Sequence, residues 1–149
     1  HISGQQDLHL SADVRMTSFM KECERQGVAC KVYSASEQML WDMEYLPLIN
    51  RIFMENPDMD GIFASSDIIA AQCIQMAGTL GYRIPEDIKI VGYDDICLSR
   101  LLYPPLTTVH QDIKGLAKTA MDTVEELIEG KQVPESQVVS VSFIERKTT

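Results

Sequence analysis

Short apolar runs alternate with amphipathic helical segments along almost the whole chain, and this alternation limits the possible folds more than any other feature. Residues 61–64 are apolar and bounded by polar residues, as buried parallel strands are, and residues 88–91 are expected to form another buried strand. Apolar side chains recur at helical spacing over residues 14–23, 46–53 and 68–76. Strands and helices in this alternation predict an α/β sandwich of three layers with a mostly parallel sheet.

Capping and turn residues set the expected boundaries of these elements. The expected helices begin near Ser11, Leu46, Asp67 and Asp112, and end near Gly27, Asn56-Pro57, Gly78 or Gly81, and Gly130. Further strands are expected at residues 28–33, 106–109 and 137–144. Residues 2–4 look like the end of a strand whose beginning was cut off. We therefore expect an internal fragment of a longer protein.

Composition excludes several classes of protein. The 149 residues are 45% hydrophobic and 23% charged, with a mean hydropathy of −0.07, which excludes a disordered chain. No apolar run approaches the roughly 18 residues that a membrane span needs. The net charge of −9 argues against this stretch itself gripping a phosphate backbone, because such contacts need clustered Lys and Arg. A nucleic-acid partner would have to touch residues outside this chain.

The four cysteines do not form a metal-binding pattern. Cys23, Cys30, Cys73 and Cys97 make no CxxC pair, and no His lies at a zinc-site spacing from them. Two disulfides are conceivable, but we expect free, mostly buried thiols in a reducing cytoplasm. We expect no metal and no cofactor.

Candidate ligand-binding residues lie where strands end, because ligands of doubly wound sheets bind at the carboxyl ends of the strands. Asp67 follows one buried strand, where it is either a helix N-cap or a polar ligand contact. Asp94 and Asp95 follow the next strand. One of these two carboxylates can bind a turn while the other, which we take to be Asp94, faces the ligand.

Two further side chains have open interpretations. Arg15 lies about one turn into the first helix, where a cation opposes the helix dipole. It is either a solvated surface residue or a clamp on a diol or carboxylate. Trp41, placed in a loop after the second strand, either plugs the edge of the core or stacks on a sugar ring.

Catalytic patterns are missing from the sequence. GxSxG, HExxH and P-loop motifs do not occur. The pair Asp94-Asp95 has no accompanying Lys and second acidic cluster for metal-assisted phosphoryl transfer. His110, followed by Gln111, is interpreted as a strand-end or interface residue. We therefore do not expect an enzyme.

Five segments together resemble the LacI/GalR family of bacterial transcription regulators, over nearly the whole chain. They read VRMTSF (14–19), GIFASSDIIA (61–70), IPEDIKIVGYDD (84–95), YPPLTTVHQD (103–112) and ERKTT (145–149). Each motif alone is weak, but their order and spacing are specific. The resemblance implies one lobe of a two-lobed effector domain with a periplasmic-binding-protein-like, Rossmann-like fold.

The resemblance also implies roles for individual residues. The implied ligand-binding set is Arg15, Trp41, Ser66, Asp67, Asp94 and Gln111. Arg15 matches the family arginine that holds ligand hydroxyls, and Asp94 matches the strand-end aspartate that accepts from them. Ser66 replaces the usual Asn, which changes the reach of one polar contact.

The implied domain organisation is the C-terminal portion of an effector domain. Residues 1–111 and 131–149 would form the C-terminal lobe, and residues 112–130 a helix that crosses toward the N-terminal lobe. The parent would be a cytoplasmic homodimer that binds operator DNA through a missing helix-turn-helix. A sugar or related polyhydroxyl ligand between the lobes would control that binding allosterically. The alternative is an extracytoplasmic sugar-binding protein of a transporter.

Overall fold

The strands of the computed structural model, which describes residues 2–3 and 11–149, form two sheets. The smaller sheet pairs β1 (Ile2–Ser3) with β2 (Tyr33–Ser34) in parallel. The larger sheet has the order β3-β4-β5-β6, with the bounds Gly61–Phe63, Lys89–Asp94, Thr107–Gln111 and Val141–Ile144. Its first three strands are parallel and β6 is antiparallel to β5. The predicted α/β class with a mostly parallel sheet is confirmed.

The described residues also form six helices. They are α1 (Ser11–Gln26), α2 (Glu37–Asp42), α3 (Leu46–Glu55), α4 (Asp67–Leu80), α5 (Cys97–Leu101) and α6 (Ile113–Ile128). The short helices α2 and α5 were not predicted. Trp41 consequently lies on α2 rather than in a loop, which corrects the sequence interpretation. The strand expected over 28–33 is limited to β2, and the expectation for Gly4 lies outside the described residues.

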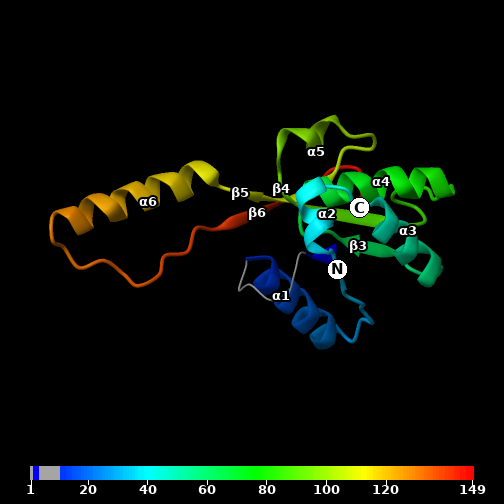
Figure 1. Cartoon of the computed structure of the whole chain (residues 1–149), viewed down its shortest axis with the longest axis horizontal. Helices are drawn as coiled ribbons and strands as arrows, with labels where there is room; N and C mark the ends of the chain where they lie inside the picture. Colours follow the sequence, from blue (N-terminus) through cyan, green and yellow to red (C-terminus); the bar gives the residue numbers. More distant parts are fainter. Residues whose placement is uncertain (1, 4–10) are drawn as a thin grey trace.

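The core lies between the larger sheet and helices α3 and α4 (Figure 1). Ile49 of α3 and Cys73 of α4 are fully buried, as are Ile90 of β4 and the nearby Ile88 and Leu106. β4 lies between β3 and β5, and its Ile90 is buried in the core beside Ile62 of β3. The expected strands at 61–64 and 88–91 are buried mainly on one face, because Lys89 is exposed and Phe63 and Val91 are only half-buried.

The helix boundaries follow the expected capping chemistry. The Ser66 hydroxyl accepts from the Ile69 N–H at 3.4 Å at the start of α4. Gly81, with φ of +82°, ends α4, so the helix ends at Gly81 and not at Gly78. Asp112 accepts from the Gly115 N–H at 2.9 Å and begins α6. Within the described part of the chain, no helix is long and apolar enough to cross a membrane.

Helix α6 and the segment that returns from it form an arm, residues 112–140, that extends away from the rest of the molecule (Figure 1). None of the residues of α6 is buried. The returning segment contacts one face of the helix, where the Gln137 amide donates to the Thr123 hydroxyl at 2.8 Å. Many apolar side chains of α6 stay exposed, including Ile113, Met121 and Ile128.

The four cysteines are free thiols, as predicted, but only Cys23 and Cys73 are buried. The expectation that most are buried is wrong, because Cys30 lies in the exposed segment between α1 and β2 and Cys97 begins the exposed helix α5. Among the described residues, no group of three or more His, Cys, Asp or Glu side chains is arranged to hold a metal ion.

Candidate functional site

The end of β4 carries two adjacent aspartates with unusual backbone conformations. Asp94 has φ of +111° and Asp95 has φ of +53°, a region that non-glycine residues rarely adopt and that proteins retain where the local structure requires it. As a result of this turn, the two carboxylates contact different groups of side chains. One group contains Arg15 and Gln111, and the other contains Arg146.

Asp94 lies between a helix and a neighbouring strand. The Gln111 amide, at the end of β5, donates to Asp94 Oδ1 at 2.7 Å. Nη1 of Arg15, on α1, lies 3.8 Å from the same oxygen. Burial raises the pKa of Asp94, and the hydrogen bond from Gln111 and the charge of Arg15 oppose that rise only in part. Asp94 is an acceptor near two donors.

Arg15 is held by an aromatic ring rather than by a complete set of hydrogen bonds. Its guanidinium carbon lies 4.2 Å from the centre of the Tyr93 ring, a favourable cation–π distance. Its distance of 3.8 Å to Asp94 is longer than a direct hydrogen bond. Its Nε is buried with no acceptor among the described residues. An unpaired buried donor is costly, and the Arg15 side chain as a whole is 20% exposed, so a ligand oxygen can reach the guanidinium at its exposed side.

Helix α1 is positioned against the larger sheet by an aromatic contact. The rings of Phe19, on α1, and Phe63, on β3, stack with their centres 5.3 Å apart. Phe19 lies one turn after Arg15, so this contact fixes the part of the helix that carries the guanidinium. The contacts of Arg15 with Tyr93 and Asp94, at the end of β4, explain why a cation lies near the start of α1.

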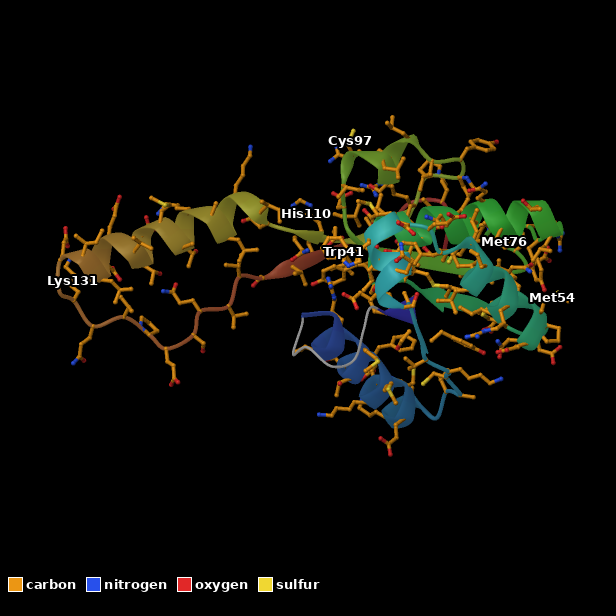
Figure 2. All side chains as sticks on the ribbon, viewed as in Figure 1. Trp41, Met54, Met76, Cys97, His110 and Lys131 are labelled. Carbon is orange, nitrogen blue, oxygen red and sulfur yellow. The ribbon has the colours of Figure 1, made fainter. Side chains whose placement is uncertain are left out.

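Asp95 belongs to a separate, mostly buried network (Figure 2 labels its member His110). Arg146 Nη2 donates to Asp95 Oδ1 at 2.5 Å, and the Ser99 hydroxyl donates to the same oxygen at 3.0 Å. His110 Nδ1 lies 3.1 Å from Oδ2. Burial alone would raise the pKa of Asp95, but the hydrogen bonds from Arg146 and Ser99 and the charge of Arg146 outweigh it and lower that pKa. Asp95 therefore joins β4 to α5 and the C-terminal segment.

Asp67 is fully buried beneath the strand ends. Its Oδ2 accepts from the Ile96 N–H at 2.9 Å and its Oδ1 from the Thr108 hydroxyl at 2.5 Å. Burial raises the pKa of Asp67 despite these hydrogen bonds. The alternative interpretation of Asp67 as the N-cap is wrong, because Ser66 is the N-cap and Asp67 is the first residue of α4. Both carboxylate oxygens of Asp67 already have protein donors.

The structure brings three of the predicted site residues into contact: Arg15, Asp94 and Gln111. Ser66 uses its hydroxyl to cap α4. Trp41 is 77% exposed on α2, and its role in ligand binding stays a prediction.

The side-chain amide of Gln72 makes two hydrogen bonds to the segment that follows Trp41. Gln72, on α4, accepts from the Tyr45 N–H at 2.7 Å and donates to the Met43 carbonyl at 2.7 Å. These two hydrogen bonds fix the junction between α2 and α3 to α4.

Sequence reasoning missed two residues that the structure places at these groups. Tyr93 precedes the aspartates and was predicted only as part of a strand end; its position directly before the candidate Asp94 is the one signal that placed an aromatic ring at the site. Arg146 lies in the segment ERKTT, which carries part of the family resemblance, but nothing local indicates a pairing with Asp95, 51 residues away in the sequence.

A cavity lined by described residues lies elsewhere, between α1, the segment before β2, and β3. Its volume is about 1000 Å³. Its lining includes Phe19, Cys23 and Cys30 but none of the six predicted ligand-binding residues. This cavity is therefore distinct from the group of Arg15, Asp94 and Gln111 at the ends of the strands.

Comparison with known proteins identifies relatives over the whole chain. Residues 2–149 match the model of the periplasmic binding protein-like domain. The ribose operon repressor of Halalkalibacterium halodurans is 35% identical over 100% of this chain and 44% of its own length. The ribose operon repressor of Bacillus subtilis is 39% identical over 68% of this chain and 32% of its own length.

A solved structure supports the same relationship. The Lac repressor bound to ONPG in its repressed state matches with a TM-score of 0.88 and 28% identity, over 99% of this chain and 44% of that one. The chain thus spans less than half the length of these relatives. The named relatives are repressors rather than enzymes or transport proteins.

Proposed function

Since this chain belongs to the periplasmic binding protein-like domain family, as an effector-binding domain of the LacI/GalR type, we propose that it senses a small sugar or a related polyhydroxyl compound. The observation that carries this proposal is the incomplete pairing of Arg15. Its guanidinium lies 3.8 Å from Asp94 and keeps a buried Nε without an acceptor among the described residues. A ligand hydroxyl can donate to Asp94 while its oxygen accepts from Arg15. Neighbouring hydroxyls on one ring suit this pair of groups.

The remaining predicted residues complete the proposed site. Gln111 lies at the base of the α6 arm and holds Asp94, so it connects the site to the segment that leaves this lobe. Trp41 supplies an exposed aromatic face of the kind that stacks on sugar rings. Ser66 and Asp67 support the proposed site from the start of α4: Ser66 caps the helix, and the buried Asp67 holds the strand ends through the Ile96 N–H and the Thr108 hydroxyl.

In the whole protein we propose that this chain is the C-terminal lobe, with residues 1–111 and 131–149 in the lobe and 112–130 crossing to an N-terminal lobe. Ligand bound between the lobes would favour one relative orientation of the two. That shift would change the affinity of a cytoplasmic homodimer for operator DNA through a helix-turn-helix outside this chain. Couplings of this kind typically change affinity about 5- to 150-fold.

The proposal is tested by titrating the full-length regulator with sugars in a calorimeter. D-ribose is the first candidate, because two of the relatives are ribose operon repressors. Arg15→Ala and Asp94→Ala should each weaken effector binding about 10- to 100-fold, since each removes a charge-assisted hydrogen bond. The fluorescence of Trp41, the single tryptophan of this chain, gives a second readout. It is measured in a variant of the full-length regulator in which any tryptophans outside this chain are replaced.

Operator binding is the control for both variants. Each variant should retain its affinity for the operator in the absence of effector, because neither residue belongs to the DNA-binding part. Loss of operator binding with normal effector affinity would contradict the proposed site. Unchanged Trp41 emission at saturating effector would remove Trp41 from the site.

A further inference from the structure

Two cysteines lie together at the end of α1, away from the proposed effector site. Cys23 is buried on the last turns of the helix, and Cys30 is exposed in the segment that follows. Both line the cavity between α1 and β3, together with Phe19 and Gln26 of the helix. Residues 19, 23 and 26 are spaced so that they share one face of α1. The buried thiol therefore faces the cavity that the exposed thiol also borders.

A tight turn brings the second cysteine back to the first. Gly27, with φ of +66°, ends α1. Its N–H donates to the Glu24 carbonyl at 3.1 Å, and the Val28 N–H donates to the Cys23 carbonyl at 2.9 Å, a Schellman-type helix end. This turn reverses the chain so that residue 30 lies beside the last turns of the helix. Burial raises the pKa of the Cys23 thiol, and the adjacent Cys30 side chain raises it further.

Both sides of this turn are held in place. The Lys31 ammonium donates to the Asn56 side-chain oxygen at 2.6 Å, which ties the segment after Cys30 to the end of α3. The stacked rings of Phe19 and Phe63 tie α1 to β3. These contacts hold both sides of the turn that brings Cys30 toward Cys23.

We propose that Cys23 and Cys30 form a reversible disulfide in response to hydrogen peroxide. The exposed Cys30 thiol loses its proton, and the thiolate attacks one peroxide oxygen; the O–O bond breaks, a sulfenic acid forms, and the released hydroxide takes up that proton and leaves as water. The Cys23 sulfur then attacks the sulfenic sulfur, the S–S bond forms, and the second water leaves. Two thiols and one peroxide give one disulfide and two waters, so the two electrons lost by sulfur reduce the peroxide. A dithiol reductant reverses the reaction by exchange.

The other two cysteines differ from this pair in ways that make them internal controls. Cys73 is fully buried in α4, and burial raises the pKa of its thiol to about 12, so it should stay reduced. Cys97 is exposed on α5. Exposed thiols oxidise, but Cys97 is not part of the turn that presents Cys30 to Cys23.

Peptide mapping tests the proposal directly. The protein is treated with hydrogen peroxide and quenched in acid, its remaining thiols are alkylated in denaturant, and it is digested with trypsin without reduction. Cleavage after Lys21, Arg25 and Lys31 separates the two cysteines onto peptides 22–25 and 26–31. We expect these peptides joined by a disulfide, two hydrogens lighter than the sum of the reduced pair. The yield should not depend on protein concentration, and dithiothreitol should abolish it.

Matched variants keep the result interpretable. Cys30→Ser, a change at an exposed position, should abolish the joined peptide, whereas Cys97→Ser should leave it unchanged. In Cys23→Ser, Cys30 should proceed to a sulfinic acid, because its resolving thiol is missing. The proposal is overturned if Cys30 of the unaltered protein becomes sulfinic acid while Cys23 is still alkylated. It is equally overturned if Cys30 is joined mainly to another cysteine.

Discussion

At the scale of single residues, Asp94 and Asp95 are neighbours with opposite electrostatic environments. Burial raises the pKa of Asp94, whereas the hydrogen bonds and charge of Arg146 lower that of Asp95 in spite of its burial. The positive φ angles of both residues separate the carboxylates, so that one belongs to the proposed ligand site and the other to the internal structure. This division leads to two predictions.

The first prediction concerns the pair of Asp95 and Arg146. Arg146→Met should lower the free energy of unfolding by about 3–5 kcal/mol, because it leaves a mostly buried carboxylate without its cation. Urea denaturation at pH 7 measures the change. The pKa of Asp95 in the folded protein is lower than its ordinary value of 3.8. The ion pair of Asp95 with Arg146 therefore contributes its full stabilisation at pH values above 3.8. It is lost as the pH falls through the lower folded value, where the variant and the unaltered protein should converge.

An exposed ion pair provides the matched control. Arg83 and Asp87 are paired at 2.5 Å, but the Arg83 side chain is 71% exposed. Arg83→Met should therefore unfold at nearly the same urea concentration as the unaltered protein, because exposed pairs contribute little. If both variants unfolded alike, the Asp95 network would not be the stabilising element we infer.

The second prediction concerns the pH dependence of effector binding. Ionised Asp94 is a stronger acceptor for ligand hydroxyls than its protonated form, and its raised pKa means that it takes up a proton at a higher pH than an ordinary aspartate does. Effector affinity should therefore fall as the pH is lowered from 7 toward 4. Calorimetric titrations over this range measure the effect. In Asp94→Asn the affinity should be weak at every pH, and persistence of the pH dependence in that variant would assign it to another group.

At the scale of elements, β4 passes so closely over Asp67 that its middle residue must be glycine. A Cβ on Gly92 would lie 2.3 Å from Asp67 Oδ1 and 2.8 Å from Leu106 Cδ2. Gly92→Ala should therefore destabilise the fold by about 1–3 kcal/mol through overpacking, measured as a lower urea midpoint. Gly78, within α4, has no atom within 4 Å of the position that a Cβ would take. Gly78→Ala should instead stabilise the protein by about 0.5–1 kcal/mol, and a loss of stability there would contradict this reasoning.

The elements also indicate how far the sequence could predict the structure. Long periodic segments such as α4 and α6 were predicted nearly to the residue, because caps such as Asp112 and the helix-ending Gly81 have specific chemistry. The helix α5, with five residues, is too short to have a readable period. Trp41 was misplaced in a loop for a similar reason, since α2 has six residues.

The candidate site was predictable where a residue type conflicted with its local position. Arg15 opposes the dipole at the start of α1, and the contact with Asp94 explains why it is there. Arg146 has no such conflict, because it follows the expected strand at 137–144 and its local position gives no sign of a partner. Its role depends on a contact across 51 residues, which neither composition nor periodicity encodes.

At the scale of the whole molecule, α6 extends away from the rest of the chain (Figure 1), and several of its apolar side chains are exposed. Leu116, Val124 and Leu127 are 43%, 48% and 55% exposed, and their spacing places them on one face of the helix. Lys118 and Asp122 form an ion pair on another face. Under the domain organisation that we propose, the N-terminal lobe covers the apolar face of α6.

This organisation predicts that one substitution has different effects in two proteins. Leu127→Lys should change the unfolding free energy of the present chain by less than about 0.5 kcal/mol, because the side chain is already exposed. In the full-length regulator it should cost about 2–5 kcal/mol, because it would place a charge where an apolar side chain is buried. Urea denaturation of both proteins measures the difference, with Lys118→Ala on the polar face as the control. Equal effects of Leu127→Lys in the two proteins would mean that this face stays uncovered and that α6 does not cross to a second lobe.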